Sequence, residues 1–171
     1  MKSVLLPLGS GSALRAVRND EHQKASTLEP TITIEQPSPE DIDAIHAVLT
    51  NTYWSPGIPR DVVARACANS MCAIARDDKG AVIGFARLVT DKATFAWLCD
   101  VIVMPGKQGK GLGRALVQTF QRHPDLQGLR RWLLGTKDAH GVYAPLGFAP
   151  LDAPDRFMHI RNPAPYGKAT A

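Results

Sequence analysis

Residues 101–116 read VIVMPGKQGKGLGRAL, and this stretch decides how the rest of the chain is interpreted. Its apolar, β-branched start predicts a strand, and the amphipathic residues after the glycines predict a helix. Between the two, alternating glycines let backbone N–H groups crowd around an anion, and the start of the helix adds unpaired N–H donors. Lys107, Lys110 and Arg114 add full positive charges. The segment therefore predicts a loop that binds a pyrophosphate.

Two common phosphate-binding motifs do not fit this loop. A P-loop requires GxxxxGK[ST], but Leu112 follows Gly111 where the lysine would stand. The dinucleotide motif requires GxGxxG, but here the third glycine, Gly113, comes one residue early and Arg114 follows it. The plainest alternative is a tight strand-to-helix turn that binds nothing, but three glycines and three basic residues exceed what such a turn requires.

The sequence on both sides of the loop predicts a mixed α/β domain. Residues Thr31–Glu35 alternate polar and apolar side chains with β-branched residues among them, which is typical of a strand. Ser38 followed by Pro39 and two acids is typical of a helix start. Two short turns, at 77–80 and 91–92, predict an antiparallel meander of three strands ahead of the loop.

The expected order of elements is β-α-α-β-β-β-α-β-α-β. The strands are expected at residues 31–35, 71–76, 82–90, 94–104, 129–134 and 157–160, and the helices from 39, at 60–69, from 109–113 to 123, and at 139–144. This order predicts a largely antiparallel sheet flanked by helices, with a parallel strand–helix–strand unit around the glycine loop. Residues 1–29 are expected to form a flexible tail, and residues 30–171 the domain.

Composition excludes several classes of protein. The 171 residues are 44% hydrophobic and 21% charged, which fits one globular domain. No apolar run approaches the roughly 20 residues that cross a bilayer, so no membrane partner is expected. The net charge of +4 suits an anionic small ligand, but no basic run indicates a nucleic-acid partner. Three cysteines without metal-ligand spacing predict no metal site and a reducing, cytoplasmic location.

Two motifs resemble those of the GNAT N-acetyltransferase superfamily. Gln108-x-x-Gly111-x-Gly113 is similar to the family motif (Q/R)-x-x-G-x-(G/A), and residues 139–148, with Tyr143 among them, are similar to the block A-x-x-x-Y-x-x-x-G-F. The resemblance covers about residues 31–161 and is strongest to a bacterial subgroup whose members mostly lack assigned substrates. It implies a GNAT-like fold, acetyl-CoA as co-substrate and a primary amine as acceptor.

The resemblance also implies which residues hold acetyl-CoA. The backbone of one strand would pair with the pantetheine arm as an added strand would, and N–H groups of the loop would hold the pyrophosphate. The residues expected to bind the co-substrate are Val101, Ile102, Val103, Gln108, Gly109, Lys110, Gly111, Leu112, Gly113 and Arg114.

The expected chemistry is attack of an amine on a thioester. An alkyl ammonium has a pKa near 10.4, so the acceptor must first lose a proton to a base. The leaving thiolate needs a proton, and Tyr143, which the resemblance places near the sulfur, is expected to donate it because tyrosine stays protonated at pH 7. A backbone N–H near Ile102 is expected to stabilise the oxyanion.

The sequence leaves the base open among Asp100, His140 and water. Asp100 interrupts an apolar strand on the same face as Ile102, and a carboxylate there is costly unless it has a partner or faces a cleft. His140 stands three residues before Tyr143, so the two share a helix face. Many family members carry Asn at the position of Thr136. Many also carry a Glu late in the central strand, and the nearest acid to that position in this chain is Asp100.

Four other residues are assigned from their positions. Tyr53 and Trp54 lie in a Pro/Gly-rich break between the first two helices, where the family's acceptor pocket begins, and aromatics there either hold a cation or anchor the loop to the core. Asp138 is expected to cap the short helix that contains His140. Tyr53, Trp54 and His140 are the residues expected to bind the acceptor. Arg87 either reaches the acceptor site or is solvated, and the solvated position is expected.

The preferred function is therefore N-acetyl transfer to a primary amine of a small molecule or peptide. The alternative is a non-catalytic module that binds or senses acyl-CoA. This alternative stays open because the chain lacks the Asn and the Glu that many family members carry. The sequence does not identify the acceptor, since one fold serves many substrates. The sequence does not fix the oligomeric state either. The resemblance implies a homodimer as one option, in which the last strand and the Pro-rich end from Asn162 would take part.

Overall fold

Two tight turns fold the middle of the chain into three antiparallel strands. The Asp77 carboxylate accepts backbone N–H groups in the first turn, and the Asp91 carboxylate does the same in the second, as such residues commonly do in turns. The strands they join are β2 (Met71–Arg76), β3 (Val82–Thr90) and β4 (Phe95–Val103). The meander expected from the sequence is confirmed.

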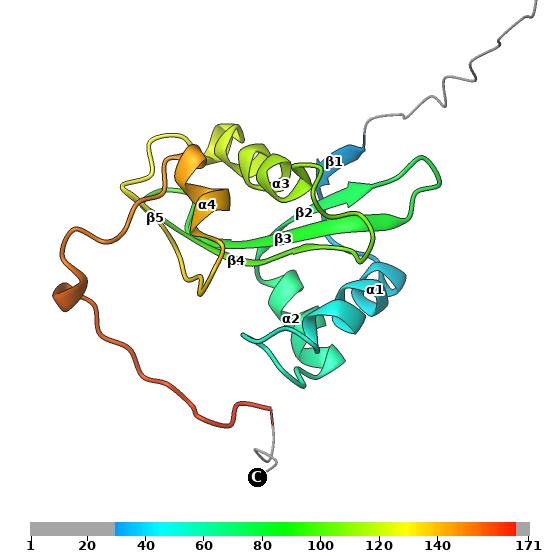
Figure 1. Cartoon of the computed structure of the whole chain (residues 1–171), viewed down its shortest axis with the longest axis horizontal. Coiled ribbons are helices and arrows are strands. Elements are labelled where there is room, and N and C mark those ends of the chain that lie inside the picture. The colour runs from blue at the N-terminus through cyan, green and yellow to red at the C-terminus, as the bar shows by residue number, and fades with distance from the viewer. Residues whose placement is uncertain (1–29, 167–171) are drawn as a thin grey trace, which may run out of the picture.

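The computed structural model describes residues 30–166, so the expected tail at 1–29 lies outside the described residues. Strands β1 (Thr31–Ile34) and β5 (Arg131–Leu134) complete a sheet of order β1-β2-β3-β4-β5 (Figure 1). Neighbouring strands are antiparallel except β4 and β5, which are parallel. The mixed, mostly antiparallel sheet is therefore confirmed. Within residues 30–166, none of the helices has the length and apolar character needed to cross a bilayer.

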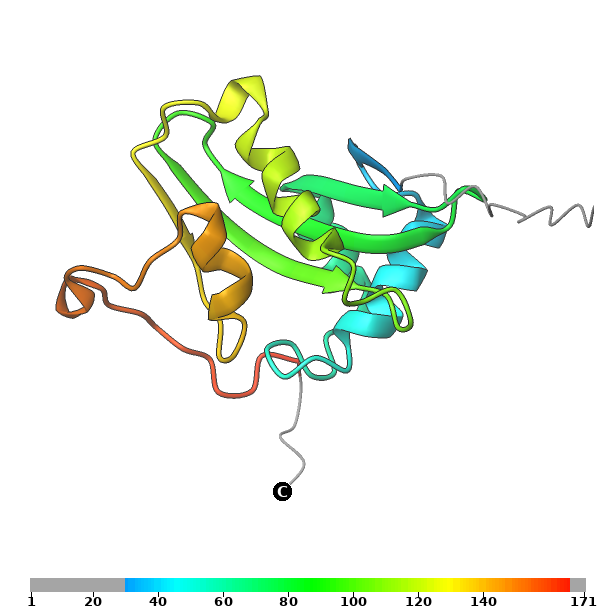
Figure 2. The ribbon, with the colours of Figure 1, turned by 45° about the horizontal axis from the view of Figure 1, so that its top comes forward.

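Helices cover both faces of the sheet. Helices α1 (Pro39–Leu49) and α2 (Arg60–Ala68) cover one face, while α3 (Leu112–Gln121) and the short α4 (His140–Tyr143) cover the other (Figure 2). Single 3₁₀ turns occur at Pro124–Leu126, Ala144–Leu146 and Pro154–Arg156. The two apolar cores lie on opposite sides of β2, β3 and β4, because alternate residues of these strands point to opposite faces.

Helix α1 begins at a reciprocal cap that the sequence predicts. The Ser38 hydroxyl accepts the Asp41 N–H, and the Asp41 carboxylate accepts the Ser38 N–H. Arg76, at the end of β2, donates to both carboxylate oxygens of Asp41, at 2.9 and 2.8 Å, and also to Glu35. The cap therefore ties α1 to the sheet at a buried position.

Helix α3 approaches the sheet closely at a glycine of β3. A Cβ on Gly84 would lie 3.1 Å from Leu112 Cδ2 and 3.2 Å from Leu116 Cδ1, which is tighter than ordinary contact. The side chains of Leu116, Val117 and Phe120 on the same helix are fully buried. This packing sets the height of the helix, and of the glycine loop before it, above β4.

One predicted element is wrong. The expected strand at 157–160 is irregular and exposed, with Met158 98% and Ile160 104% exposed. No neighbouring strand within the described residues offers its edge to this segment, and a strand needs such a partner to satisfy its backbone. The other elements differ from expectation by one to three residues at their ends, where helices and strands fray.

Candidate active site

The glycine loop adopts the backbone that its sequence predicts. Gly106, Gly109 and Gly111 have φ angles between 77° and 81°, in the left-handed region that favours glycine. Gly111 is the N-cap of α3 and provides no side-chain cap, and the first turn of that helix contains no acid. The first N–H groups of α3 therefore lack side-chain acceptors and present positive charge to an anion.

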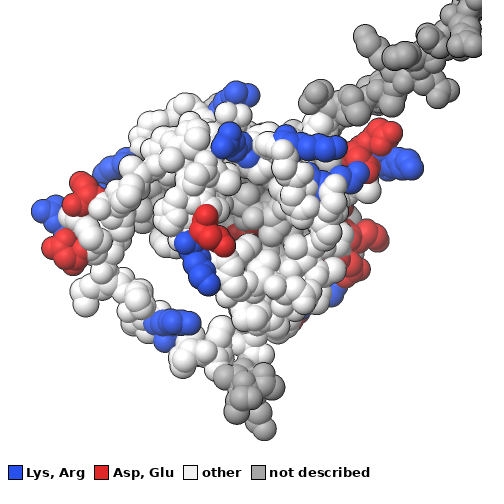
Figure 3. Space-filling view, in the orientation of Figure 1, with Lys and Arg blue, Asp and Glu red and all other residues white. Residues whose placement is uncertain are grey.

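Basic and polar side chains surround this loop. Lys107, Gln108 and Lys110 are exposed in it, and Lys and Arg side chains gather over this part of the surface (Figure 3). The Gln108 amide donates to the carbonyl of Val103 at 3.2 Å, which ties the loop to the end of β4. Arg114 donates to the carbonyl of Gly141 at 3.2 Å, which links α3 to α4. These donors fit a pyrophosphate group.

The β4 edge next to the loop lacks a strand partner. Strand β5 pairs with β4 only from Phe95 to Leu98, and the chain leaves the sheet after Leu134. From Cys99 to Val103, no strand within residues 30–166 pairs with this side of β4, although β3 pairs with the other side. Val101 and Val103 pack toward α3, and Ile102 is buried on the opposite face. The exposed backbone edge leads directly into the glycine loop.

A bulge in β4 presents Asp100 to a small cavity. Between the pairs Phe85–Ile102 and Arg87–Cys99, β4 has one residue more than β3, and Asp100 has a φ of 50°. Arg87 Nε donates to Asp100 Oδ2 at 2.7 Å, and Arg87 also donates to Ser70. The expectation that Arg87 is solvated is therefore wrong: its side chain is 17% exposed.

The Arg87–Asp100 pair forms one wall of a cavity of about 150 Å³. Trp54, Ile58, Phe85 and Tyr166 also line this cavity. Burial acts to lower the pKa of Arg87, but the charge and hydrogen bond of Asp100, together with smaller effects of Cys99 and Cys67, outweigh it, and the net shift of the pKa is upward. The guanidinium therefore stays charged, and the cavity combines apolar walls with a fixed ion pair.

Tyr143 lies at the end of α4 on the other side of the unpaired β4 edge. Its ring meets Phe148 edge to face, with centroids 6.0 Å apart. Burial raises the pKa of the Tyr143 hydroxyl, and the nearby Tyr53 raises it further. A tyrosine in this state keeps its proton well above neutral pH, as a proton donor must.

The family model described as "Acetyltransferase (GNAT) family" matches residues 34–148. The chain belongs to this family.

Three relatives show how far the similarity extends. A GNAT-family protein from Xanthomonas campestris pv. campestris, solved as a crystal structure, is 41% identical over 81% of this chain and 99% of its own, with a TM-score of 0.74. A Gibberella zeae protein, named as a candidate acetyltransferase, is 30% identical over 57% of this chain and 66% of its own length, just under two thirds. The aminoglycoside N-acetyltransferase AAC(6')-Iy, solved with CoA, shares the fold at 19% identity and a TM-score of 0.57, over 80% of this chain and 97% of its own.

Tyr53, in the segment between α1 and α2, contacts the loop that follows β5. Its hydroxyl accepts the backbone N–H of Lys137 at 2.9 Å, and the ammonium of Lys137 lies 5.9 Å from its ring centroid. Trp54 stacks edge to face on Tyr53 at 4.8 Å and lines the small cavity. Both aromatic side chains are about half exposed, so they do not anchor this segment in the core.

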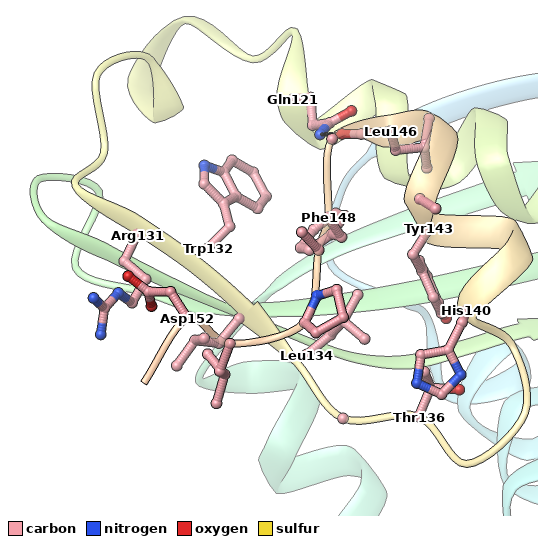
Figure 4. Close-up of a pocket in the computed structure, with 17 residues that line it drawn as sticks. Gln121, Arg131, Trp132, Leu134, Thr136, His140, Tyr143, Leu146, Phe148 and Asp152 are labelled. Carbon is pink, nitrogen blue, oxygen red and sulfur yellow. Dashed lines mark hydrogen bonds between the residues drawn. The ribbon is translucent and has the colours of Figure 1, made fainter. Parts of the chain in front are cut away.

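His140 lies at a cavity, whereas Asp138 does not have the capping role expected for it. His140 begins α4 and, with Tyr143, lines a larger cavity beside β5 (Figure 4). The expectation that Asp138 caps α4 is wrong: the N-cap is Ala139, and the hydroxyl of Thr136 accepts the Ala139 N–H at 3.0 Å. Thr136, which replaces an Asn common in the family, thus shapes the start of this helix.

The surroundings of Cys99 on β4 disfavour the reactive thiolate form. Burial raises the pKa of the Cys99 thiol to about 11, so it is protonated at neutral pH. Its side chain is half-buried. Sequence reasoning underrated Arg87, although one signal was present: Arg87 and Asp100 each interrupt an apolar strand of the same hairpin.

Proposed function

We propose that this chain transfers an acetyl group from acetyl-CoA to a primary amine of a small molecule or peptide. The observation that carries the proposal is the unpaired edge of β4 at residues 99–103. It runs from the Asp100 cavity to the glycine loop, so one extended ligand can contact both. The CoA complex of AAC(6')-Iy, which shares this fold, supports the choice of co-substrate.

The loop and the β4 edge would each bind a different part of the co-substrate. The N–H groups of residues 108–114, with Lys110 and Arg114 beside them, would hold the pyrophosphate. The backbone of Val101–Val103 would hold the pantetheine arm as an added strand. Acetyl-CoA then supplies an acetyl group activated as a thioester, and the remaining steps belong to the residues of this chain.

The acceptor amine would enter the cavity beside Trp54. Arg87 binds Oδ2 of Asp100, which leaves Oδ1 to accept an ammonium hydrogen. The apolar walls favour an acceptor whose amine is carried on a short apolar stem. The exposed rings of Tyr53 and Trp54 would contact the charged amine by cation–π interaction as it enters.

Proton transfer is shared between the two sides of the site. Asp100, His140 and water are the groups that can take the proton from the ammonium, and Asp100 can do so only by weakening its bond to Arg87. Tyr143 would donate a proton to the leaving thiolate. The bulge frees backbone at Asp100 and Val101 from the β3 ladder, and an N–H there would stabilise the negative charge on the carbonyl oxygen.

The test is release of free CoA from acetyl-CoA across a panel of small primary amines and peptides, with Tyr143→Phe as the comparison. Amine-dependent release that the variant loses supports the proposal. Binding of acetyl-CoA without release for any amine would contradict it and favour the non-catalytic acyl-CoA-binding module.

A further inference from the structure

The small cavity of the candidate active site has a charged residue of each sign on its wall. Among the described residues that line this volume of about 150 Å³, Arg87 and Asp100 are the charged ones. Ile58 and Phe85, on the same wall, are apolar and buried. The Ser55 hydroxyl also lies there, but it already donates to a backbone carbonyl at 3.0 Å. Polar recognition of a ligand in this cavity therefore depends mainly on the ion pair.

Each member of the ion pair keeps one polar atom free. Arg87 Nε donates to Asp100 Oδ2 at 2.7 Å, and Arg87 Nη1 donates to Ser70 Oγ at 3.1 Å. Within residues 30–166, Arg87 Nη2 and Asp100 Oδ1 make no hydrogen bond. The buried side-chain polar atom without a partner in this part of the chain is Thr33 Oγ1, so neither free atom of the pair is sealed inside the protein. Both atoms are therefore accessible, and the cavity is a space that both side chains border.

The charge balance of the cavity favours a ligand that carries both signs. The ion pair is neutral as a whole, so an alkyl ammonium would bring an unmatched positive charge into a mostly apolar space, which is costly. An α-amino acid brings no net charge, because its carboxylate balances its ammonium. These two groups are attached to one carbon and lie close together, as do the free atoms of an ion pair whose members are directly bonded. The zwitterion can therefore pair with both members at once.

We propose that the acceptor is a free α-amino acid with a small apolar side chain, an inference that rests on the proposed acetyl transfer and makes it more specific. Arg87 Nη2 donates to the carboxylate of the amino acid, and Asp100 Oδ1 accepts from its ammonium. The apolar wall at Ile58 and Phe85 surrounds its side chain. The N-terminal amine of a peptide has no carboxylate on the same carbon, so it offers nothing to Arg87. Arg87 is thus a residue that determines specificity.

The acetyl transfer to an amino acid balances in atoms and charge. The ammonium loses one proton to the base, and the electron pair of the amine nitrogen forms the new bond to the carbonyl carbon. The C–S bond then breaks with its electron pair on the sulfur. The nitrogen loses its second proton, which replaces the proton that Tyr143 donates to the sulfur. The products are an N-acetyl amino acid, free CoA and one released proton.

The test compares ligands that differ in the carboxylate. L-alanine, L-valine and L-leucine are titrated calorimetrically into the full chain, with and without CoA, beside their amides and beside ethylamine, isobutylamine and isoamylamine, which lack the carboxylate. At least one amino acid should bind about 10- to 100-fold more tightly than its amine and its amide, as a hydrogen bond between charged groups provides. Equal or weaker binding of all three amino acids would overturn the proposal.

Arg87→Lys tests the specificity residue. Lysine keeps a positive charge beside Asp100, but one ammonium cannot replace the separate N–H groups that bind Asp100, Ser70 and the ligand. The affinity for the amino acid should fall about tenfold or more, while the affinity for the matched amine stays the same. Arg65→Lys, at an exposed arginine of α2, is the matched control. An equal loss for amine and amino acid would show a merely structural role for Arg87 and contradict its assignment.

Release of free CoA from acetyl-CoA separates this inference from the proposed function. Faster release with the amino acids than with their amines supports both. Faster release with the amines or with peptides overturns the amino-acid acceptor and leaves acetyl transfer standing. Tight binding of an amino acid without release of CoA overturns acetyl transfer, and with it the role of the amino acid as acceptor.

Discussion

Arg87 Nε on β3 lies 2.7 Å from Asp100 Oδ2 on β4, at the point where β4 bulges. Asp tolerates the positive φ of 50° better than most residues, since its short polar side chain can bond locally. The bulge turns the carboxylate toward the small cavity, and the guanidinium fixes it there. The proposed acceptor side of the site therefore depends on two strands rather than on a loop.

Asp100→Asn tests the acceptor side. The change removes the charge that would attract an ammonium, so kcat/KM for the amine should fall about 10- to 100-fold, the value of a hydrogen bond to a charged group. The affinity for acetyl-CoA should not change. Steady-state kinetics with a calorimetric control measures both, and Asp78→Asn, an exposed carboxylate in the β2–β3 turn, is the matched variant. An unchanged kcat/KM would remove Asp100 from the site.

Tyr143→Phe tests the proton donor. The variant should lower kcat about 10²- to 10⁴-fold, the usual contribution of a general acid, with little effect on acetyl-CoA affinity. Because burial raises the pKa of this hydroxyl, the protonated form persists above the ordinary value near 10. The kcat of the wild type should therefore not fall as the pH is raised to about 10, and it should decline only beyond that pH. A decline with a midpoint below that pH would contradict the assignment.

Asp41→Asn tests the buried cap of α1. Its hydrogen bonds with Arg76 outweigh the opposing effect of burial and hold the pKa of Asp41 below its ordinary value. Such a group stabilises the fold above its unfolded pKa, near 3.9, and that contribution disappears as pH falls through the lower folded pKa. The variant should cost about 1–3 kcal/mol of unfolding free energy at neutral pH.

Denaturant unfolding at several pH values measures this effect, and the difference between wild type and variant should shrink in acid. Asp43→Asn, whose pairing with Arg60 is exposed, is the control and should change little. An equal loss for both variants would show that burial of the Asp41 pair does not matter.

Gly84→Ala tests the close approach of α3 to β3. The added Cβ would press on Leu112 and Leu116, and crowding in a well-packed core costs about 1–3 kcal/mol. Thermal unfolding should show a lower Tm than wild type. Gly135→Ala, where a Cβ would meet nothing within 4 Å, is the control. A Tm equal to that of the wild type would mean that the two leucines simply move aside.

Local signals in the sequence predicted most of the fold. Ser38 followed by Pro39 and two acids, and the two Asp-containing turns, are satisfied by neighbours within a few residues, so their geometry can be read from the sequence. The glycine loop belongs to the same class, since the positive φ angles are a property of each residue itself.

Three features were missed, and two of them depend on distant parts of the chain. Asp138 was predicted to cap α4, but the N-cap is Ala139, which has no side-chain cap, and the hydroxyl of nearby Thr136 accepts the Ala139 N–H. Arg87 is partly buried beside Asp100, which stands in a bulge of β4, and neither strand reveals the bulge by itself. Residues 157–160 have the composition of a strand, but composition does not say whether a neighbouring edge is within reach.

The most direct test of the central claim is a calorimetric titration of acetyl-CoA into three proteins: wild type, Gly111→Val and Gly113→Ala. At φ 77°, a β-branched residue at 111 strains the N-cap of α3 by about 1–2 kcal/mol or more, whereas a Cβ at 113 makes only ordinary contacts at 3.9 Å. We expect the wild type and Gly113→Ala to bind alike and Gly111→Val to bind at least about tenfold more weakly, with ATP and NAD giving no heat. Equal affinity in all three, or no binding by the wild type, would contradict the claim that this loop holds the co-substrate.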